Sequence, residues 1–500
     1  MLRFRREVYL DNNATTKVSL VVRRKVSNIL KNCYGNPSSL YKIARNSAEV
    51  LAESRQQVAQ AINAHAHEIL FTGSATEANN AILKSVSEHF YPRKTKIITT
   101  PIEHASVMST LEFLKTRGIK VVYCPVDNKG FLNRAVLATL LDEDTFLLCC
   151  MLANNEIGTI QEITAISQLA KQHQILLMVD CVQALGKVPV DVQALGIDYA
   201  SFSAHKIHGP KGIGALYIRQ NCLFSPFIHG GHQEAGKRAG TESLHNIAGF
   251  ATACTEIPQL LKKSQQIRDL THYLVQEIKK IKPDCIINSP ENHCLPNTVN
   301  ITFPKVNNAI FMAMLDYYGI SVSAGSACNT QDDAPSFVLK ALGLSDTAAR
   351  ETLRFSLTAN TSWRDLRYVV KIVSEYFSGH RTPINIITPA QLTENILFDK
   401  DTYILDVRDY YDRKLLKGLP HSHEAGFLSI RKYVNQLPQD KNILTVCQMG
   451  YNSAIVAYYL KSKHFKNVSF LLTGLVGWKL YHSDLYKKYA GKNIIPLIPE

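Results

Sequence analysis

The sequence predicts an α/β protein in which a large domain with a mostly parallel sheet is followed by a second, smaller α/β domain. Short apolar segments alternate with amphipathic ones up to about residue 378, which is typical of strand–helix–strand units with helices on both faces of the sheet. A polar segment with Gly and Pro then follows, and the alternation starts again. The length of 500 residues also exceeds what one hydrophobic core normally holds.

The strands of the large domain are expected where short apolar runs occur. These runs are Val8–Asp11, Lys96–Thr100, Lys120–Cys124, Thr145–Cys150, Leu176–Asp180 and Tyr199–Ser203. Apolar residues at helical spacing predict helices at Ala75–Glu88, Ser106–Arg117 and Ile163–Gln172. A smaller block of mixed structure is expected from about Lys262 to Phe377.

The last part of the chain has its own set of elements. We expect strands at Ile384–Ile387, Thr402–Arg408 and Asn442–Cys447, and a helix that begins within Pro389–Asn395, with proline at an early position. The predicted organisation is a first domain at 1–378, a linker at 379–387 and a second domain at 388–500. The second domain has the size of one independent α/β unit.

Composition excludes several classes of protein. Apolar residues make up 46% and charged residues 20% of the chain, as in globular proteins. The net charge of +14 comes from scattered basic residues, so we expect no direct nucleic-acid binding, although the charge suits an acidic partner. No apolar run reaches the ~20 residues that span a membrane, and the strand at Val8 leaves no room for a signal peptide before it. Eleven cysteines without paired zinc-type spacing indicate a cytoplasmic protein with no metal site.

One lysine and one aspartate lie where an α/β sheet presents functional groups. Lys206 follows a predicted strand and precedes the turn His208-Gly-Pro-Lys-Gly212, and burial there would favour the neutral amine that attacks aldehydes. Asp180 ends a buried strand. Such a pair suits pyridoxal phosphate, whose aldehyde needs an amine and whose pyridine nitrogen needs an acid. Taken alone, the two residues are equally well read as a surface lysine and a helix cap.

Other candidates lie at the ends of strands or in turns. Segment 72–80 suits a phosphate at a helix N-terminus, or an ordinary helix cap. His104 suits ring stacking and proton transfer, and Arg354 suits a substrate carboxylate or a structural salt bridge. Cys328, among very small residues, is either an accessible nucleophile or a buried thiol. Polar side chains that could assist are those of Asn155 and Gln183.

The order of these motifs resembles one enzyme family. Tyr9-Leu-Asp-Asn-Asn-Ala-Thr-Thr16, the Ala-Thr-Glu-Ala-Asn-Asn run at 75–80, Glu103-His104, Asn154-Asn-Glu156, Ser203-Ala-His-Lys206 and Gly325-Ser-Ala-Cys328 are similar to motifs of the pyridoxal-phosphate-dependent cysteine desulfurases, in their long-loop, iron–sulfur-cluster type. The match covers about residues 7 to 378. It implies the fold type I transferase architecture, with a large parallel-sheet domain and a small domain.

The resemblance implies a role for each candidate. Lys206 would hold the cofactor as a Schiff base, with His104 stacked on the ring, Asp180 on the pyridine nitrogen and Gln183 on the ring hydroxyl. L-Cysteine would bind through Asn155 and Arg354, and the Cys328 thiolate would take its sulfur as a persulfide, leaving alanine. The remaining cofactor-binding residues would be Ala75, Thr76, Ser203, His205 and, from the other subunit of a homodimer, Thr241.

The C-terminal domain resembles a rhodanese. Leu405-Asp-Val-Arg408, Val446-Cys-Gln-Met-Gly-Tyr-Asn-Ser453 and Leu472-Thr-Gly-Leu-Val-Gly-Trp478 are similar to motifs of that family. A cysteine at a strand-to-helix turn faces backbone N–H groups that stabilise a thiolate or a persulfide. Asn452 stands where the family commonly has arginine, which puts anionic sulfur donors in doubt without affecting a persulfide on Cys447.

These observations predict a fused enzyme that passes sulfur from Cys328 to Cys447 and then to an acceptor protein, either a cluster scaffold or a thiolation enzyme. Two alternatives remain open from the sequence. The large domain is also compatible with a selenocysteine lyase, and the C-terminal domain with a docking module that does no chemistry.

Overall fold

The computed structural model describes residues 6–325, 335–379 and 384–497. Its largest element is a seven-stranded sheet in the order β2-β8-β7-β6-β5-β3-β4. The five strands from β7 to β4 are parallel, and β8 runs antiparallel to both of its neighbours. The bounds are β2 Ile69–Thr72, β3 Lys96–Thr99, β4 Lys120–Tyr123, β5 Thr145–Met151, β6 Leu176–Asp180, β7 Tyr199–Ser203 and β8 Gly214–Ile218.

Helices cover both faces of this sheet, as the alternating pattern predicts. In β5, Leu147 and Cys149 pack into one apolar cluster together with α3 and α4, whereas Leu148 and Cys150 pack into another together with α6 and α7. The cysteines of β5 and the neighbouring Cys181 are fully buried, so they serve packing. The helices of this part are α1 Leu20–Asn32, α2 Lys42–Ala61, α3 Ala75–Phe90, α4 Ala105–Lys115, α5 Arg134–Leu140, α6 Ile163–Gln172 and α7 Leu244–Thr255.

A smaller part follows in the sequence, and the start of the chain packs onto it. Its antiparallel sheet has the order β12-β10-β9, and the N-terminal strand β1 pairs with β11 beside it. The strands are β1 Val8–Tyr9, β9 Ile286–Ile287, β10 Thr298–Thr302, β11 Ile320–Ser321 and β12 Thr352–Ser356. The helices are α8 Ile257–Lys262, α9 Ser264–Ile281, α10 Asn308–Tyr317, α11 Phe337–Ala341, α12 Asp346–Arg350 and α13 Trp363–Phe377.

The C-terminal part is a parallel six-stranded sheet in the order β13-β17-β16-β14-β15-β18. Its strands are β13 Asn385–Ile387, β14 Thr402–Asp406, β15 His423–Glu424, β16 Asn442–Val446, β17 Val468–Leu471 and β18 Ile495–Pro496. Its helices are α14 Glu394–Leu397, α15 Tyr410–Leu415, α16 Ile430–Tyr433, α17 Tyr451–Ser462, α18 Gly474–Tyr481 and α19 Ser483–Tyr489. The helix expected from Pro389 is only a 3₁₀ turn, Pro389–Gln391, separated from α14 by Leu392 and Thr393.

The boundary before this part differs from the linker expected at 379–387. Strand β13 lies inside that linker and pairs in parallel with β17. The C-terminal sheet therefore includes residues before 388. We propose that the C-terminal domain begins at about residue 384 and that the domain before it ends near 378.

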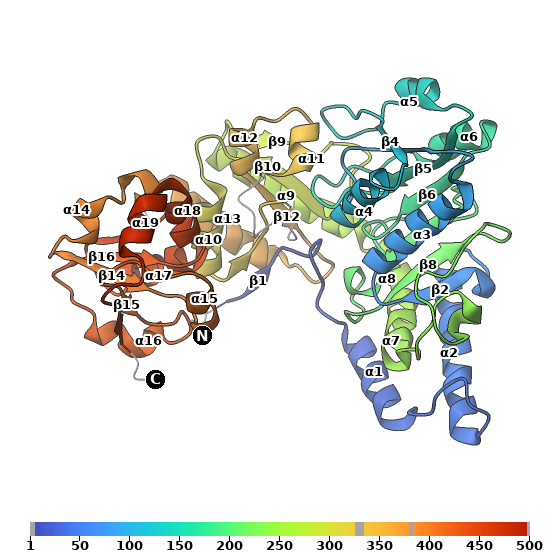
Figure 1. The fold of residues 1–500 in the computed structure, drawn as a ribbon, viewed down its shortest axis with the longest axis horizontal. Coiled ribbons are helices and arrows are strands. Elements are labelled where there is room, and N and C mark those ends of the chain that lie inside the picture. Colours follow the sequence, from blue (N-terminus) through green and yellow to red (C-terminus); the bar gives the residue numbers. More distant parts are fainter. Residues whose placement is uncertain (1–5, 326–334, 380–383, 498–500) are drawn as a thin grey trace.

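The C-terminal part packs against the small domain (Figure 1). Helix α17 lies along α10, where the rings of Tyr458 and Tyr317 stack with centroids 6.0 Å apart. Tyr451 Oη donates a hydrogen bond of 3.3 Å to Asp316 Oδ2, and apolar residues of both parts join in one buried cluster. The start of α17 is thus fixed against the small domain. None of the described helices is long and apolar enough to cross a membrane.

Candidate active site

A cavity of about 210 Å³ opens beside the carboxyl ends of β5, β6 and β7. It gathers almost all of the predicted cofactor and substrate residues: Ala75, Thr76, His104, Asn155, Asp180, Gln183, Ser203, His205, Lys206 and Arg354. Thr241 is exposed and does not line it. Cys328 lies outside the described residues. Parallel strands end at one edge of the sheet, which explains why residues from distant parts of the sequence meet here.

Lys206 ends a short 3₁₀ turn, Ala204–Lys206, that directly follows β7. Its Nζ donates hydrogen bonds to the carbonyl oxygens of Asn13, at 2.5 Å, and of Ala14, at 2.8 Å. These carbonyls belong to the segment after β1, which crosses from the small domain to the cavity. The N-terminal segment therefore orients the amine, a role that the strand pattern does not predict.

Asp180 ends β6 and is 5% exposed. One carboxylate oxygen accepts from Asn79 Nδ2 at 3.0 Å, and the other from the backbone N–H of Val182 at 3.0 Å. Asn79 also donates to Ser106 Oγ, while its own Oδ1 is buried without a hydrogen-bond partner. The carboxylate is thus fixed at the cavity wall by donors, which suits a partner that carries a proton.

His104 is the N-cap of α4, and its Nδ1 accepts the backbone N–H of Ser106 at 3.1 Å. Burial lowers the pKa of this imidazole; the nearby charge of Asp180 opposes the shift and that of Lys206 reinforces it. The ring is therefore neutral near pH 7. Because Nδ1 is an acceptor, a neutral ring carries its proton on Nε2.

Glu103, next to His104, is fully buried behind the cavity. Its Oε1 accepts from Thr100 Oγ1 at 2.6 Å and from the backbone N–H of Met151 at 3.0 Å. Burial raises the pKa of this carboxyl to about 8, because these two hydrogen bonds only partly offset the loss of water. Glu103 is thus a largely neutral acid at pH 7.

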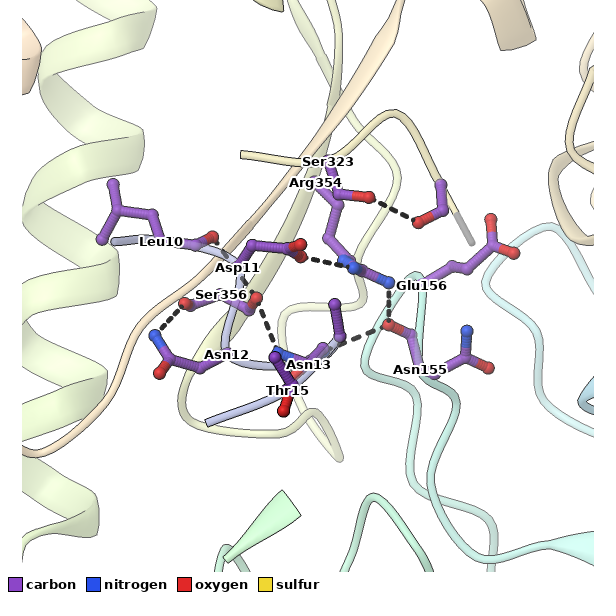
Figure 2. Close-up of polar contacts among 12 residues, drawn as sticks. Leu10, Asp11, Asn12, Asn13, Thr15, Asn155, Glu156, Ser323, Arg354 and Ser356 are labelled. Atoms are coloured by element: carbon purple, nitrogen blue, oxygen red, sulfur yellow. Dashed lines mark hydrogen bonds and ion pairs between the residues drawn. The ribbon is translucent and has the colours of Figure 1, made fainter. Parts of the chain in front are cut away.

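Arg354 lies on β12 and is 1% exposed. Figure 2 shows its guanidinium between two segments: Nη2 pairs with Asp11 Oδ1 at 2.6 Å, and Nη1 donates to the carbonyl oxygen of Asn155 at 2.9 Å. Its Nε is buried without a partner. The expected anion-binding arginine is therefore present at the cavity, but a carboxylate of the protein is already bound to it. Asp11 was not among the predicted site residues.

The N-terminus of α3 forms the other end of the cavity. Ser74 caps the helix, and Ala75 and Thr76 lie in its first turn, where free N–H groups and the helix dipole favour an anion. Burial lowers the pKa of nearby His205 to about 4, with the charges of Lys206, Lys211 and Lys187 acting in the same direction. Its Nδ1 lies 3.1 Å from Thr15 Oγ1. The segment suits a phosphate group.

Gln183 is tied to a residue that the sequence patterns do not single out. Its Nε2 donates to the Asn13 carbonyl at 2.9 Å, and its Oε1 accepts from Nζ of the half-buried Lys187. Lys187 also donates to Asn13 Oδ1 at 3.1 Å. Burial lowers the pKa of the Lys187 ammonium well below its ordinary value, and the Lys206 charge adds to this. Asn13, which lines the cavity, thus links Gln183 to Lys187, which does not line it.

The cavity has the groups that pyridoxal phosphate requires. It contains an amine for the aldehyde, a carboxylate for the pyridine nitrogen, a neutral imidazole for the ring and a helix N-terminus for the phosphate. The buried, unpartnered Oδ1 of Asn79 is a further polar atom at this site. The residues present therefore fit the cofactor.

Cys447 follows β16 and is 4% exposed. Its Sγ accepts the backbone N–H groups of Gly450 at 3.1 Å and Ser453 at 3.3 Å, and lies 3.4 Å from Ser453 Oγ. Gly450 has φ +91° at the N-cap of α17, a conformation that favours glycine. A turn of seven residues thus surrounds the sulfur with donors, as the motif predicts. Asn452 adds no hydrogen bond to this set.

The neighbouring arginine of the Leu405–Arg408 motif does not reach the sulfur. Arg408 and Asp406 form a fully buried ion pair, with Nη2 and Oδ2 2.7 Å apart, and Arg408 Nη1 donates to the Leu416 carbonyl. Arg408 therefore stabilises the turn after β14. Cys447 is surrounded by backbone dipoles and one hydroxyl, without a cation bound to its sulfur among the described residues.

Comparisons with known proteins assign each of the two parts of the chain to a family. Residues 8–369 match the aminotransferase class-V family, and residues 388–481 match the rhodanese-like domain. The cysteine desulfurase IscS of Dictyoglomus turgidum is 39% identical over 379 residues, covering 76% of this chain and 96% of that protein.

Two solved structures are similar to the first part. A NifS-like protein superposes with a TM-score of 0.71 at 38% identity, covering 75% of this chain and all of that one. SspA in complex with cysteine superposes with a TM-score of 0.64 at 32% identity, covering 71% of this chain and all of that one.

Proposed function

The chain belongs to the class-V aminotransferase family and continues into a rhodanese-like domain, and on this basis we propose that it is a pyridoxal-phosphate-dependent cysteine desulfurase. The proposed reaction joins the sulfur of L-cysteine to the Cys328 thiol. The carbon–sulfur bond of cysteine breaks, its carbon gains a proton to give L-alanine, and Cys328 becomes a persulfide. Thiol and amino acid enter, and persulfide and amino acid leave, so no external oxidant or reductant is needed.

The observation that carries this proposal is the convergence of four different groups on one cavity. An amine, a carboxylate, an imidazole and a guanidinium line it together, from Lys206, Asp180, His104 and Arg354. Pyridoxal phosphate, when bound, supplies an aldehyde that condenses with amines and a ring that accepts electron density. Asp180 would hold its ring nitrogen and Gln183 its ring hydroxyl.

The phosphate would lie at the N-terminus of α3. Thr76, Ser203 and His205 are the residues assigned to it, with Ala75 beside Thr76 in the same helical turn. His205 would act there as a neutral donor, because its pKa is lowered to about 4. We assign Thr241 to the phosphate of the second subunit. Its exposure outside the cavity fits a residue that functions across the interface of a homodimer.

Substrate would bind through its carboxylate and exchange protons with two residues. Arg354 is assigned to the carboxylate, with Asn155 beside it. Lys206 and His104 lie on the same cavity, so the proton removed from the α-carbon and the proton given to the product have nearby acceptors and donors. The neutral His104, protonated on Nε2, is suited to donate to a leaving sulfur.

The second step of the proposal transfers the sulfur atom to Cys447. The Cys447 thiol loses its proton and attacks the outer sulfur of the persulfide, the sulfur–sulfur bond to Cys328 breaks, and the leaving Cys328 thiolate takes up that proton. The backbone N–H donors around the Cys447 sulfur stabilise the thiolate that attacks. Cys447 would then deliver sulfur to an acceptor protein for iron–sulfur clusters or for tRNA or cofactor thiolation. Ten described cysteines are free thiols, which supports a reducing cytoplasm.

The test is to load the full chain with pyridoxal phosphate, add L-cysteine, and locate persulfides by mass spectrometry after non-reducing digestion. We expect persulfide on both Cys328 and Cys447, with none on Cys447 in Cys328→Ala. Cys33→Ser, which changes a half-buried thiol elsewhere, should leave both labels unchanged. Persulfide on Cys328 alone would refute the relay and leave the desulfurase. Cofactor binding without alanine or persulfide would refute the proposed activity.

A further inference from the structure

A second cavity, of about 460 Å³, lies away from the Lys206 site. One wall is the face of α9 that presents Arg268, His272, Val275 and Lys279, which recur at helical spacing. The opposite wall is formed by segments 287–291 and 294–299, with Lys129 at the edge. Its volume is within the range of sites for small organic molecules.

The charge of this cavity has one predominant sign. Lys129, Arg268 and Lys279 are cationic and His272 is titratable, whereas Glu291 is the only carboxylate among its lining residues. Arg268 is half-buried and makes no hydrogen bond or ion pair within the described part of the chain. A partly desolvated guanidinium without an acceptor favours an anion, and its planar fork suits phosphate or carboxylate oxygens.

The charges of two of the cations act on the same buried thiol of the wall. Burial raises the pKa of the Cys294 thiol to about 12, and the charges of Arg268 and Lys129 both oppose that shift. Arg268 and Lys129 thus both lie close enough to the buried Cys294 for their charges to act on its thiol. Lys129 is held there by the carbonyl oxygens of Ile287, at 2.8 Å, and Asn288, at 3.4 Å, so its ammonium is positioned without a carboxylate to neutralise it.

Beside the polar side chains of Thr271, Gln276, Ser289 and Thr298, the remaining lining has an apolar part. Side chains of Val275, Ile287, Leu295 and Val299 and two prolines contribute to it. An anion alone would leave this surface wet, whereas an anion attached to an apolar group would cover it and gain from its burial. The two features select the same kind of ligand.

We propose that this cavity binds a small organic anion, with its phosphate or carboxylate on Arg268 and its apolar part against Val275 and Val299. The site is separate from the cofactor cavity, and the two share no lining residue. The proposal does not depend on the desulfurase reaction, because it rests on the lining of this cavity alone.

The test is isothermal titration of the full chain loaded with pyridoxal phosphate, so that the phosphate cradle of α3 is filled. Phenyl phosphate and benzoate are the probes that combine an anion with an apolar ring; inorganic phosphate and phenol each supply one half. We expect saturable binding of phenyl phosphate or benzoate with one site per chain. Each half-probe should bind at least tenfold more weakly.

Two variants and one control locate the site. Arg268→Gln should weaken binding of the ring-bearing anion at least tenfold. Lys279→Gln, at an exposed position on the same helix face, should weaken it about threefold and serves if the first variant is unstable. Arg431→Gln removes an equal charge from an exposed position of α16 and should change nothing.

Three results would overturn the proposal. The first is no saturable binding of phenyl phosphate or benzoate, and the second is equal binding of inorganic phosphate, which would mean general attraction to a basic protein. The third is unchanged affinity in both Arg268→Gln and Lys279→Gln, which would place the ligand elsewhere, including the turn around Cys447.

Discussion

The cofactor cavity and the Cys447 turn present functional groups in opposite ways. The cavity is built from side chains contributed by widely separated segments, from Asn13 to Arg354, and several of them are charged and buried. The Cys447 site is a single turn of seven residues in which two backbone N–H groups donate hydrogen bonds to the sulfur. One site is composite, and the other is local.

The difference determines what can disturb each site. In the composite cavity, the charges interact: Lys206 acts on the pKa values of His104, His205 and Lys187. A change at one residue should therefore alter others. The Cys447 turn depends on its own backbone geometry and on the start of α18 beside it, where a Cβ at Gly474 would overlap the Cys447 carbonyl oxygen. It should remain intact when the large domain is altered.

The largest effect should follow from Lys206→Ala. Removing the amine eliminates both the attachment of the cofactor and one proton carrier, so we expect alanine formation from L-cysteine to fall by at least about 10³-fold. The rate at which iodoacetamide modifies Cys447 should stay within twofold, because its turn receives no group from the cavity. Lys171→Ala, at an exposed lysine on α6, is the control. Activity within tenfold of the original protein would refute the role of Lys206.

Glu103→Gln tests how much buried charge the composite site carries. The folded pKa of Glu103 is about 8, above its ordinary 4.5, so between these values the folded state retains a proton that the unfolded state loses. Stability should therefore fall as pH rises from about 4.5 to 8, by up to about 1.4 kcal/mol per pH unit, and level off above that. The amide keeps an oxygen for Thr100 and Met151 but cannot ionise.

The measurement is the melting temperature of both proteins at pH 5 and pH 8, within the same buffer series. The melting temperature of Glu103→Gln should increase relative to that of the original protein as the pH rises. The exposed Glu143→Gln, at a position beyond the cavity, should give no such gain. Parallel pH curves for the original protein and Glu103→Gln would show that Glu103 ionises normally in the folded state.

The sequence predicts the composite site only where strand ends create it. Asp180, His104, Asn155 and Lys206 follow strands, and the rule that parallel strands end at one edge places them together. Asp11 and Asn13 follow the short strand β1 of the small domain, and they reach the cavity only because that strand pairs with β11. No local pattern encodes that pairing, so their contacts with Arg354 and Lys206 needed the structure.

The local site shows the opposite outcome. The motif around Cys447 contains its own strand end, glycine and helix start, and the structure confirms the predicted turn. What the sequence does not reveal is the packing of α17 on α10, since apolar residues on a buried helix do not specify their partner. The 3₁₀ turn at Pro389 was also missed, because proline early in a helix fits both conformations.

Asp11→Asn tests whether a carboxylate of the protein competes with substrate at Arg354. The substitution keeps the shape and removes the charge that pairs with the guanidinium. We expect L-alanine, an unreactive carboxylate ligand, to bind about tenfold more tightly, equivalent to about 1.4 kcal/mol. The melting temperature should fall because a buried guanidinium loses its ion pair.

Spectroscopic titration of the cofactor-loaded protein with L-alanine gives this affinity. Asp365→Asn removes a carboxylate that pairs with Arg6 outside the cavity, and its affinity for alanine should equal that of the original protein. Weaker alanine binding in Asp11→Asn would mean that Asp11 orients Arg354 and does not compete for it.

The smallest effect is expected from Tyr451→Phe, at a hydrogen bond between the Cys447 turn and the small domain. The Tyr451 hydroxyl donates a hydrogen bond to Asp316. Burial raises the pKa of this carboxyl, and the hydrogen bond offsets part of that rise. Its loss should cost about 1 kcal/mol, seen as a lower denaturant midpoint. Tyr458→Phe, whose ring stacks on Tyr317, keeps the stacking and should cost less.

If the Cys447 turn is local, iodoacetamide should modify Cys447 at the same rate in Tyr451→Phe. A rate several-fold higher would mean that the contact with α10 holds the turn closed, and the site would then be composite as well.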